Sequence, residues 1–151
     1  MKKTLLLSLL LLISLMVQAQ NEITIDGKVA NVKDGLVVSL FRRDGRVGST
    51  IARDTIENGR FHFKVKPEKE LDKLSLFVHS TDFPSMSREV YASPNVHIQV
   101  NGKDNLIYTW EVKSNVKEQK ESDRYLYAAK DLWIEYQRIM AEVSGCWGVV
   151  D

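Results

Sequence analysis

ENGRFHFKV, residues 57–65, is the stretch of sequence that decides the fold class. Asn58-Gly59 is a strong hairpin signal because both residues accept the positive φ angles that a tight two-residue turn requires. After this turn, apolar and polar residues alternate from Phe61 to Val65, which is the period of a strand with one buried face. The sequence therefore predicts a β-hairpin between this strand and the strand predicted over 47–55.

The same period of two recurs along most of the chain. Asp44-Gly45 and Asn101-Gly102 are further tight-turn signals. Seven or eight short strands joined by such turns, with no helical period between them, are typical of an antiparallel β-sandwich or a partly open barrel. The strands are predicted over 22–29, 36–42, 47–55, 61–65, 74–79, 89–92, 96–100 and 106–112.

The pattern changes after Val112. From about residue 118 to residue 143, apolar residues recur at steps of three and four, which predicts one long amphipathic helix. Burying a large apolar side chain is worth about 1.5–3 kcal/mol, so we expect this stripe to pack on the β-domain. The alternative is a protein partner, either a second copy or a thioredoxin-like domain. The candidate partner-binding residues are Tyr125, Leu132, Trp133, Tyr136 and Met140.

The first 19 residues are typical of a cleaved export signal. Lys2 and Lys3 form a charged start, residues 5–17 form an apolar run, and Val17-Gln18-Ala19 has the small-residue pattern of a cleavage site. No cysteine follows for a lipid anchor, and the apolar run is shorter than the roughly 20 residues that span a bilayer. We expect a periplasmic or secreted protein that is not a lipoprotein and has no stable membrane insertion after cleavage.

Composition excludes some classes of partner and leads to a division of the chain. The 151 residues include 21 basic and 20 acidic ones, and removal of Lys2 and Lys3 leaves 19 basic residues against 20 acidic. A chain so close to neutral, without clustered basic residues, does not indicate binding to nucleic acid or a lipid surface. We divide the chain into the signal peptide 1–19, the β-domain 20–113, a linker or docking helix 114–143, and an apolar tail 144–151 that is either a natural end or a truncation point.

Several motifs together resemble a known family: ITIDGKV at 23–29, Asp34-Gly35, Asp54-Thr55 and NGRFHF at 58–63. They resemble the domain of unknown function that precedes the thioredoxin-like (AhpC/TSA-type) domain in periplasmic thiol-disulfide oxidoreductases of Bacteroidetes. The resemblance covers roughly residues 23–142. It implies an exported β-domain followed by a helix that leads toward a redox domain.

The resemblance does not extend to catalytic residues. The redox domains of that family use Trp-Cys-x-x-Cys, in which one thiolate attacks a disulfide and the second cysteine resolves the intermediate. The chain has one cysteine, Cys146, followed by Trp147 in the reverse order. We therefore predict no catalytic, cofactor-binding or metal residues. Cys146 is interpreted as an incidental residue, the alternatives being one half of an intermolecular disulfide and a redox role with a partner thiol.

Two hypotheses follow for function. The chain is either a non-catalytic exported accessory or binding module, or the N-terminal fragment of an oxidoreductase whose redox domain is missing. Three histidines, His62, His79 and His97, fall on outward faces of predicted strands and match no zinc signature, so we interpret them as solvated surface residues. Tyr108 and Trp110 on the last predicted strand are expected in the core, the alternative being a stacking surface for sugars or peptides.

Overall fold

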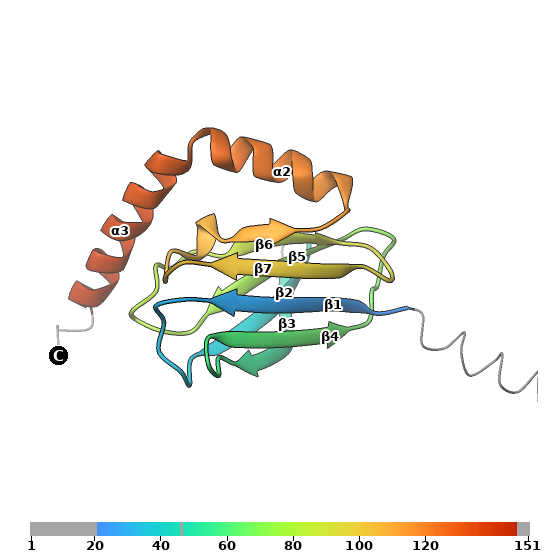
Figure 1. Cartoon of the computed structure of the whole chain (residues 1–151), viewed down its shortest axis with the longest axis horizontal. Helices are drawn as coiled ribbons and strands as arrows, with labels where there is room; N and C mark the ends of the chain where they lie inside the picture. The colour runs from blue at the N-terminus through green and yellow to red at the C-terminus, as the bar shows by residue number, and fades with distance from the viewer. Residues whose placement is uncertain (1–20, 46, 148–151) are drawn as a thin grey trace, which may run out of the picture.

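The computed structural model describes residues 21–45 and 47–147, with side chains as far as residue 143. The predicted signal peptide 1–19 and the Cys146 side chain lie outside the described residues. Eight strands in the described part form two four-stranded sheets that pack face to face (Figure 1). This confirms the prediction of a mainly β protein with a helical C-terminal segment, and the two separate sheets make it a sandwich.

Sheet A has the strand order β4-β1-β7-β8, and sheet B has the order β3-β2-β5-β6. All pairings are antiparallel except the pairing of β1 with β7, which is parallel. The strands of sheet A are β1 Ile23–Val29, β4 Arg60–Val65, β7 His97–Gly102 and β8 Glu111–Lys113. The strands of sheet B are β2 Val37–Asp44, β3 Val47–Thr55, β5 Asp72–Val78 and β6 Arg88–Ala92.

The turn at Asn58-Gly59 forms, but it does not make the predicted hairpin ladder. Both residues have positive φ (51° and 69°), and Glu57 and Arg60 exchange two backbone hydrogen bonds of 3.0 Å. The strand before the turn pairs with β2 in sheet B, whereas the strand after it pairs with β1 in sheet A. Ile56 is fully buried just before the turn and anchors the chain in the core as it crosses between the sheets. By contrast, Asp44-Gly45 does join a hairpin, that of β2 and β3.

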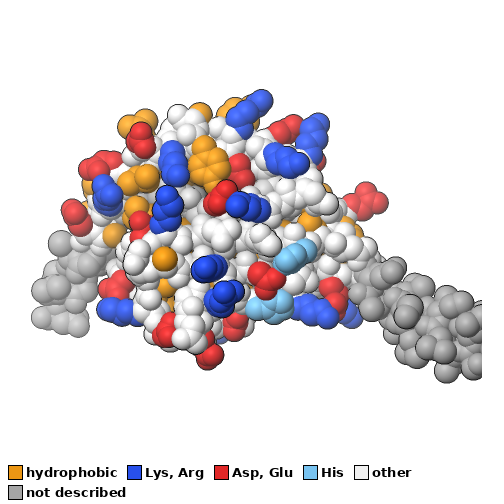
Figure 2. Space-filling view, viewed as in Figure 1, with side chains coloured by type: hydrophobic (Ala, Val, Ile, Leu, Met, Phe, Trp, Pro, Cys, Tyr) orange, Lys and Arg blue, Asp and Glu red, His pale blue; other side chains and the backbone are white. Residues whose placement is uncertain are grey.

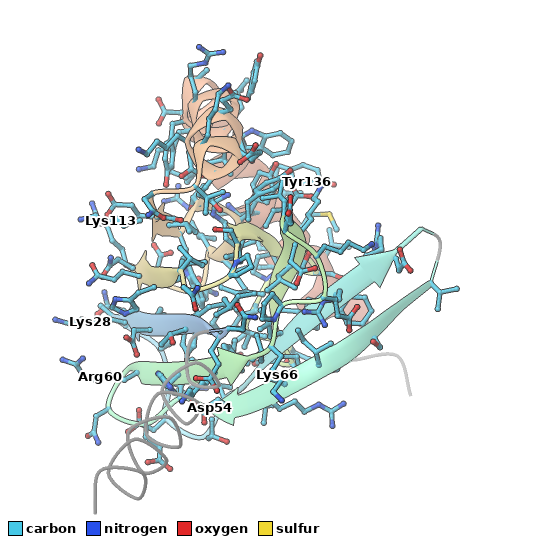
Figure 3. All side chains as sticks on the ribbon, turned by 90° about the vertical axis from the view of Figure 1, so that its right-hand side faces the viewer. Lys28, Asp54, Arg60, Lys66, Lys113 and Tyr136 are labelled. Atoms are coloured by element: carbon cyan, nitrogen blue, oxygen red, sulfur yellow. The ribbon has the colours of Figure 1, made fainter. Side chains whose placement is uncertain are left out.

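The core lies between the two inner sheet faces. Alternate residues of β1, β4, β5 and β7 are buried while their neighbours face solvent, as the period of two predicts. Phe61 lies directly opposite Gly27, and its ring occupies the space that a Cβ at Gly27 would need. Figure 3 shows the sandwich turned by 90°, with Lys28 and Arg60 projecting away from it on the outer side of sheet A.

The strand predicted over 106–112 is wrong in its first half. Residues Ile107–Thr109 form the short 3₁₀ helix η1, and only Glu111–Lys113 pair as β8. The Trp110 indole N–H donates to the Asp104 carbonyl at 2.9 Å, and Thr109 N–H donates to the Leu106 carbonyl at 3.1 Å. These local bonds fold the segment back on itself, which places Trp110 in the core as expected.

The single helix predicted by the sequence is observed as two helices, α2 Lys117–Ala128 and α3 Lys130–Trp147, which meet at Ala129 (φ −121°, ψ 28°). α3 continues through Ser144-Gly145, where the sequence predicts the helix end. Figure 1 shows α2 running along the side of the sandwich and α3 turning down past its end. The change of direction at Ala129 lets the two helices follow both surfaces.

Candidate functional site

α2 is held against sheet B by a buried amide. Gln119 is completely buried, and its Oε1 accepts a hydrogen bond of 2.8 Å from the backbone N–H of Tyr91. Tyr91 lies on β6, the edge strand of sheet B, and this N–H points away from β5 toward the helix. Because a buried backbone donor without a partner is destabilising, Gln119 both satisfies the strand edge and attaches the helix.

A buried ion pair lies beside this amide. The guanidinium of Arg88, 1 % exposed, donates from Nε to the Trp110 carbonyl at 2.8 Å and from a terminal nitrogen to Asp123 Oδ1. The same carboxylate oxygen accepts from Gln119 Nε2 at 2.9 Å. Burial raises the pKa of the nearby Tyr127 phenol. A polar network thus connects β6, η1's C-terminal end and α2.

α3 is held in the same way at the other end of the segment. Gln137 is completely buried, and its Oε1 accepts a hydrogen bond of 2.8 Å from the backbone N–H of Tyr108 in η1. Its Nε2 donates back to the Trp133 carbonyl at 3.1 Å. Both helices are therefore attached to the β-domain through glutamine side chains, which the predicted apolar stripe did not include.

The expectation that the apolar stripe packs on the β-domain is wrong for most of its residues. Leu132 is 75 % exposed and Tyr125 is 71 % exposed. Trp133 and Met140 are half-buried at the border of the stripe, and the Trp133 ring contacts Tyr108 edge-on at a centroid distance of 4.8 Å. Figure 2 shows hydrophobic side chains gathered on the helices. We call the exposed large apolar residues of α3 the α3 ridge. The α3 ridge consists of Leu132, Tyr136, Ile139 and Val143, which are 43–75 % exposed.

The α3 ridge has the spacing of a helix-pairing seam. Its residues follow one another at steps of four, three and four, which is the alternation of a and d positions in a heptad repeat. Tyr125 stands seven residues before Leu132, but it lies on α2, before the change of direction at Ala129, so it is not part of this row. The exposed row therefore suits a second helix better than it suits a flat sheet.

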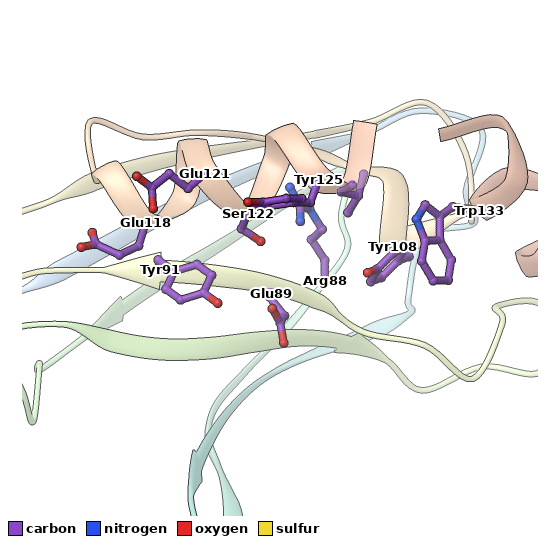
Figure 4. Close-up of a pocket in the computed structure, with 10 residues that line it drawn as sticks. Arg88, Glu89, Tyr91, Tyr108, Glu118, Glu121, Ser122, Tyr125 and Trp133 are labelled. Atoms are coloured by element: carbon purple, nitrogen blue, oxygen red, sulfur yellow. The ribbon is translucent and has the colours of Figure 1, made fainter. Parts of the chain in front are cut away.

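A groove of about 460 Å³ lies between β6, α2 and the start of α3 (Figure 4). In Figure 4, Glu118, Ser122 and Tyr125 line it from α2, and Trp133 lies at one end. Four aromatic side chains and three carboxylates contribute to its walls. These are Tyr91, Tyr108, Tyr125, Trp133, Glu89, Glu118 and Glu121. Tyr125 and Trp133 belong to the predicted partner-binding set. Trp133 contacts Tyr136 of the α3 ridge edge-on at a centroid distance of 6.1 Å, so the groove adjoins the ridge.

The chain's own cations occupy part of the groove's rim. Lys73 forms an ion pair with Glu89 at 2.6 Å and lies 5.7 Å from the centre of the Tyr91 ring. The hydrogen bond to Glu89 raises the pKa of Lys73. Arg124 lies in the same way over Tyr125, at 5.3 Å. Two of the four aromatic rings of the groove, those of Tyr91 and Tyr125, therefore already have a cation over one face. In the described part of the chain, the exposed apolar side chains of the α3 ridge have no such cover from charged groups.

A second polar site, which the sequence did not predict, lies on the outer face of sheet A. Asp26 on β1 bridges two histidines, with Oδ1 2.7 Å from His62 Nδ1 and Oδ2 2.6 Å from His97 Nε2. β4 and β7 are the two neighbours of β1, which is why histidines 35 positions apart in sequence meet here. The prediction of solvated histidines is only half met: each of these side chains is 54 % exposed, yet each is bonded to Asp26.

The electrostatics of this cluster follow from the two bonds. Hydrogen bonds from His62, first, and from His97 hold the pKa of Asp26 below its ordinary value. Because an ionised carboxylate only accepts hydrogen bonds, His62 donates from Nδ1 and His97 from Nε2. No set of three or more His, Cys, Asp or Glu side chains within residues 21–143 is arranged to hold a metal ion.

The third histidine is separate from this cluster. His79 Nε2 lies 2.9 Å from the Oγ of buried Ser39, and its ring contacts Phe77 edge-on. No carboxylate hydrogen bond to His79 is present in the described part of the chain, so the pair lacks the third member of a Ser-His-Asp triad. We interpret it as a hydrogen bond that satisfies the buried serine hydroxyl.

Comparison of the chain with models of protein families, with curated proteins and with solved structures finds no match. The resemblance to the domain that precedes thioredoxin-like domains therefore stays a prediction. Of the helices that the structure describes, none combines the length and apolar character needed to cross a bilayer.

Proposed function

We propose that this chain is a non-catalytic exported binding module that associates with a second copy of itself through the α3 ridge. The observation that carries the proposal is the exposure of the ridge, with Leu132 at 75 %, while the same helix is attached to its own domain by Gln137. Exposed apolar patches of this kind usually mark association surfaces.

A helix of a second copy is the occupant that fits the ridge. Its four-three-four spacing places a continuous row of knobs along α3, and such rows pack into the matching row of a facing helix. Every copy carries the same uncovered row. A twofold arrangement therefore covers both rows at once, as isologous interfaces do.

The area available supports a weak, concentration-dependent dimer. Since a large aromatic side chain buries about 150–250 Å², the ridge with Tyr125 would remove on the order of 500 Å² per chain from water. Stable interfaces bury about 800 Å² per partner. The adjoining groove at Trp133 offers additional surface to the partner.

The resemblance described above is consistent with a function in binding and not in catalysis. An accessory domain of that kind positions a substrate or sets the geometry of a dimer for a redox domain. The alternative is that the chain is the N-terminal part of such an oxidoreductase, in which the ridge would contact the redox domain. A chain that stays monomeric in solution would favour this alternative over self-association.

The test is light scattering coupled to size-exclusion chromatography, run on residues 20–151 over a wide range of concentrations. We expect the mass to rise toward that of a dimer, and Leu132→Gln with Ile139→Gln to weaken the dimer at least about tenfold because each loses buried apolar surface. Arg138→Gln is the matched control, since Arg138 is exposed on the same helix at a c position of the heptad, away from the row of a and d positions. A monomer at every concentration, or equal weakening by the control, would contradict the proposal.

The non-catalytic part is tested by insulin reduction. Because the chain has one cysteine, we expect insulin to be reduced no faster with the protein than in a control that contains buffer and dithiothreitol alone. Turnover that requires Cys146, shown by its loss in Cys146→Ser, would contradict this part while leaving the self-association result unaffected.

A further inference from the structure

The outer face of sheet A carries two opposed cations without a counter-ion. Lys28 on β1 is directly opposite Arg60 on β4 in the antiparallel register, and both side chains are exposed. Among the described residues neither has an ion-pair partner, whereas Lys64 on the same face pairs with Glu22 at 2.7 Å. Like charges directly opposite each other destabilise a strand pair. An anion between them would remove this repulsion.

A hollow of about 740 Å³ lies over these strands and includes both cations. Figure 3 shows Lys28 and Arg60 projecting to the same outer side of the sheet. Asn101 on β7 is the register partner of Lys28 on its other side, and Gln99 is the register partner of Asp26. The amide groups of Asn101 and Gln99 both line the hollow and add neutral hydrogen-bond donors to the two charged ones.

The carboxylates around the hollow are largely committed to protein donors. Asp54 accepts from the backbone N–H of Thr55 at 2.8 Å and from that of His62 at 2.6 Å. Asp26 accepts from its two histidines, as described above. Glu57 also lines the hollow, is exposed, and faces solvent beside Arg60. These three carboxylates exceed the two cations by one charge at neutral pH, so the proposed site rests on the direct opposition of Lys28 and Arg60 and not on the total charge of the hollow.

Asp26 is ionised at neutral pH, because hydrogen bonds from His62 and His97 hold its pKa below the ordinary value. Further charged groups on this face form two separate ion pairs, Lys64 with Glu22 and Lys113 with Glu111.

We propose that this face binds an oxyanion, a sulfate or carboxylate group of a ligand, between Lys28 and Arg60. The planar guanidinium of Arg60 provides two parallel donors that match two oxygens of such a group, and Lys28 provides a point charge. Asn101 and Gln99 supply the neutral donors. This site is on a different face from the α3 ridge and does not depend on self-association.

The test is a titration of ¹⁵N-labelled protein, residues 20–151, with sodium sulfate and separately with sodium acetate, at constant ionic strength. Backbone amide shifts should saturate on β1, β4 and β7, the strands that carry the four donors. The stronger of the two anions identifies the preferred oxyanion geometry. Absence of saturation with both anions would overturn the proposal.

Three single substitutions separate a site from general screening of charge. Lys28→Gln and Arg60→Gln should each weaken binding about tenfold because each removes a charge-assisted donor. Lys64→Gln, the matched control on the same face, should change it less than about twofold. Equal weakening by all three would show ionic screening only and overturn the proposal. All three positions are exposed, and the same spectra report whether each variant is folded.

Discussion

The β-sandwich and the helical segment bury their side chains in opposite ways. In the sandwich, apolar residues of β1, β4 and β7 point inward and polar residues point outward. In α2 and α3, the completely buried residues are Gln119 and Gln137. Leu126 is also buried, but Tyr125 and the four residues of the α3 ridge point outward. The comparison teaches that an amphipathic stripe reveals a helix but does not reveal which face of the helix meets its own domain.

The reason lies in what each helix meets. α2 runs along β6, an edge strand whose outward N–H groups have no neighbouring strand, and α3 meets the backbone of η1. Unpaired backbone groups need polar partners when they are covered. Glutamine side chains supply these partners, so the helices turn their amides inward and their apolar ridge is left for another surface.

Two tryptophans give the largest contrast between the regions. Trp110 is 1 % exposed and contacts the rings of Phe61 and Phe83, so Trp110→Ala should lower the free energy of unfolding by about 3–5 kcal/mol. Trp133 is half-buried beside Tyr108, and Trp133→Ala should lower it by no more than about 1.5 kcal/mol. Urea unfolding followed by circular dichroism measures both. Equal losses would show that α3 is as much a part of the core as the sheets are.

The next largest effect is expected at the buried ion pair of Arg88 and Asp123, which joins β6 to α2. Asp123→Ala leaves the Arg88 guanidinium buried without its carboxylate and should lower the free energy of unfolding by about 3 kcal/mol. Amide exchange at Tyr91 should rise with it, because α2 carries both Asp123 and Gln119. In Arg88→Met with Asp123→Ala no charge is buried, so part of the stability should return. If the double variant is no more stable than Asp123→Ala, the loss does not arise from an unpaired charge.

The smallest effect tests the outer face of sheet A. Hydrogen bonds from His62 and His97 hold the pKa of Asp26 below 3.8, its ordinary value, so ionised Asp26 stabilises the fold above that pH. This stability is lost as the pH falls through the lowered pKa of the folded state. Because the carboxylate is half-exposed, the gain over Asp26→Asn should stay below about 1 kcal/mol near neutral pH. Unfolding at a series of pH values should show the gain shrinking below about pH 4, and a gain that persists at still lower pH would contradict the assignment.

Much of the sandwich could be predicted from local pattern. The positions of seven strands follow from local sequence: from the period of two in most of them, from a β-branched and apolar run at 36–42, and from the preceding turn at 47–55. The positive φ angles at Asn58, Gly59 and Gly45 follow from the turn chemistry of these residues. The hairpin at Asn58-Gly59 was predicted with the wrong partners because a tight turn fixes the reversal of the chain but not the sheet to which each arm belongs. That choice depends on Ile56, whose burial moves the chain from one sheet to the other.

The candidate sites were less accessible to sequence reasoning. Tyr125 and Leu132 were named from helical spacing, yet their exposure depends on how Gln119 and Gln137 orient the helices. The cluster around Asp26 was missed because its members come from three strands that are neighbours only in the folded sheet. The one available signal was that each of its histidines alternates with buried residues and so faces outward.

The sequence by itself determined that this is a β protein with an amphipathic helical end and one cysteine, since periodicity, turn residues and composition act within a few residues of chain. Tertiary structure alone decided which strands are neighbours, which face of α3 is covered, and which charges on sheet A lie opposite each other. These outcomes depend on contacts between segments far apart in the chain. A backbone edge that needs hydrogen bonds can outweigh an apolar stripe when the two compete for the same side of a helix.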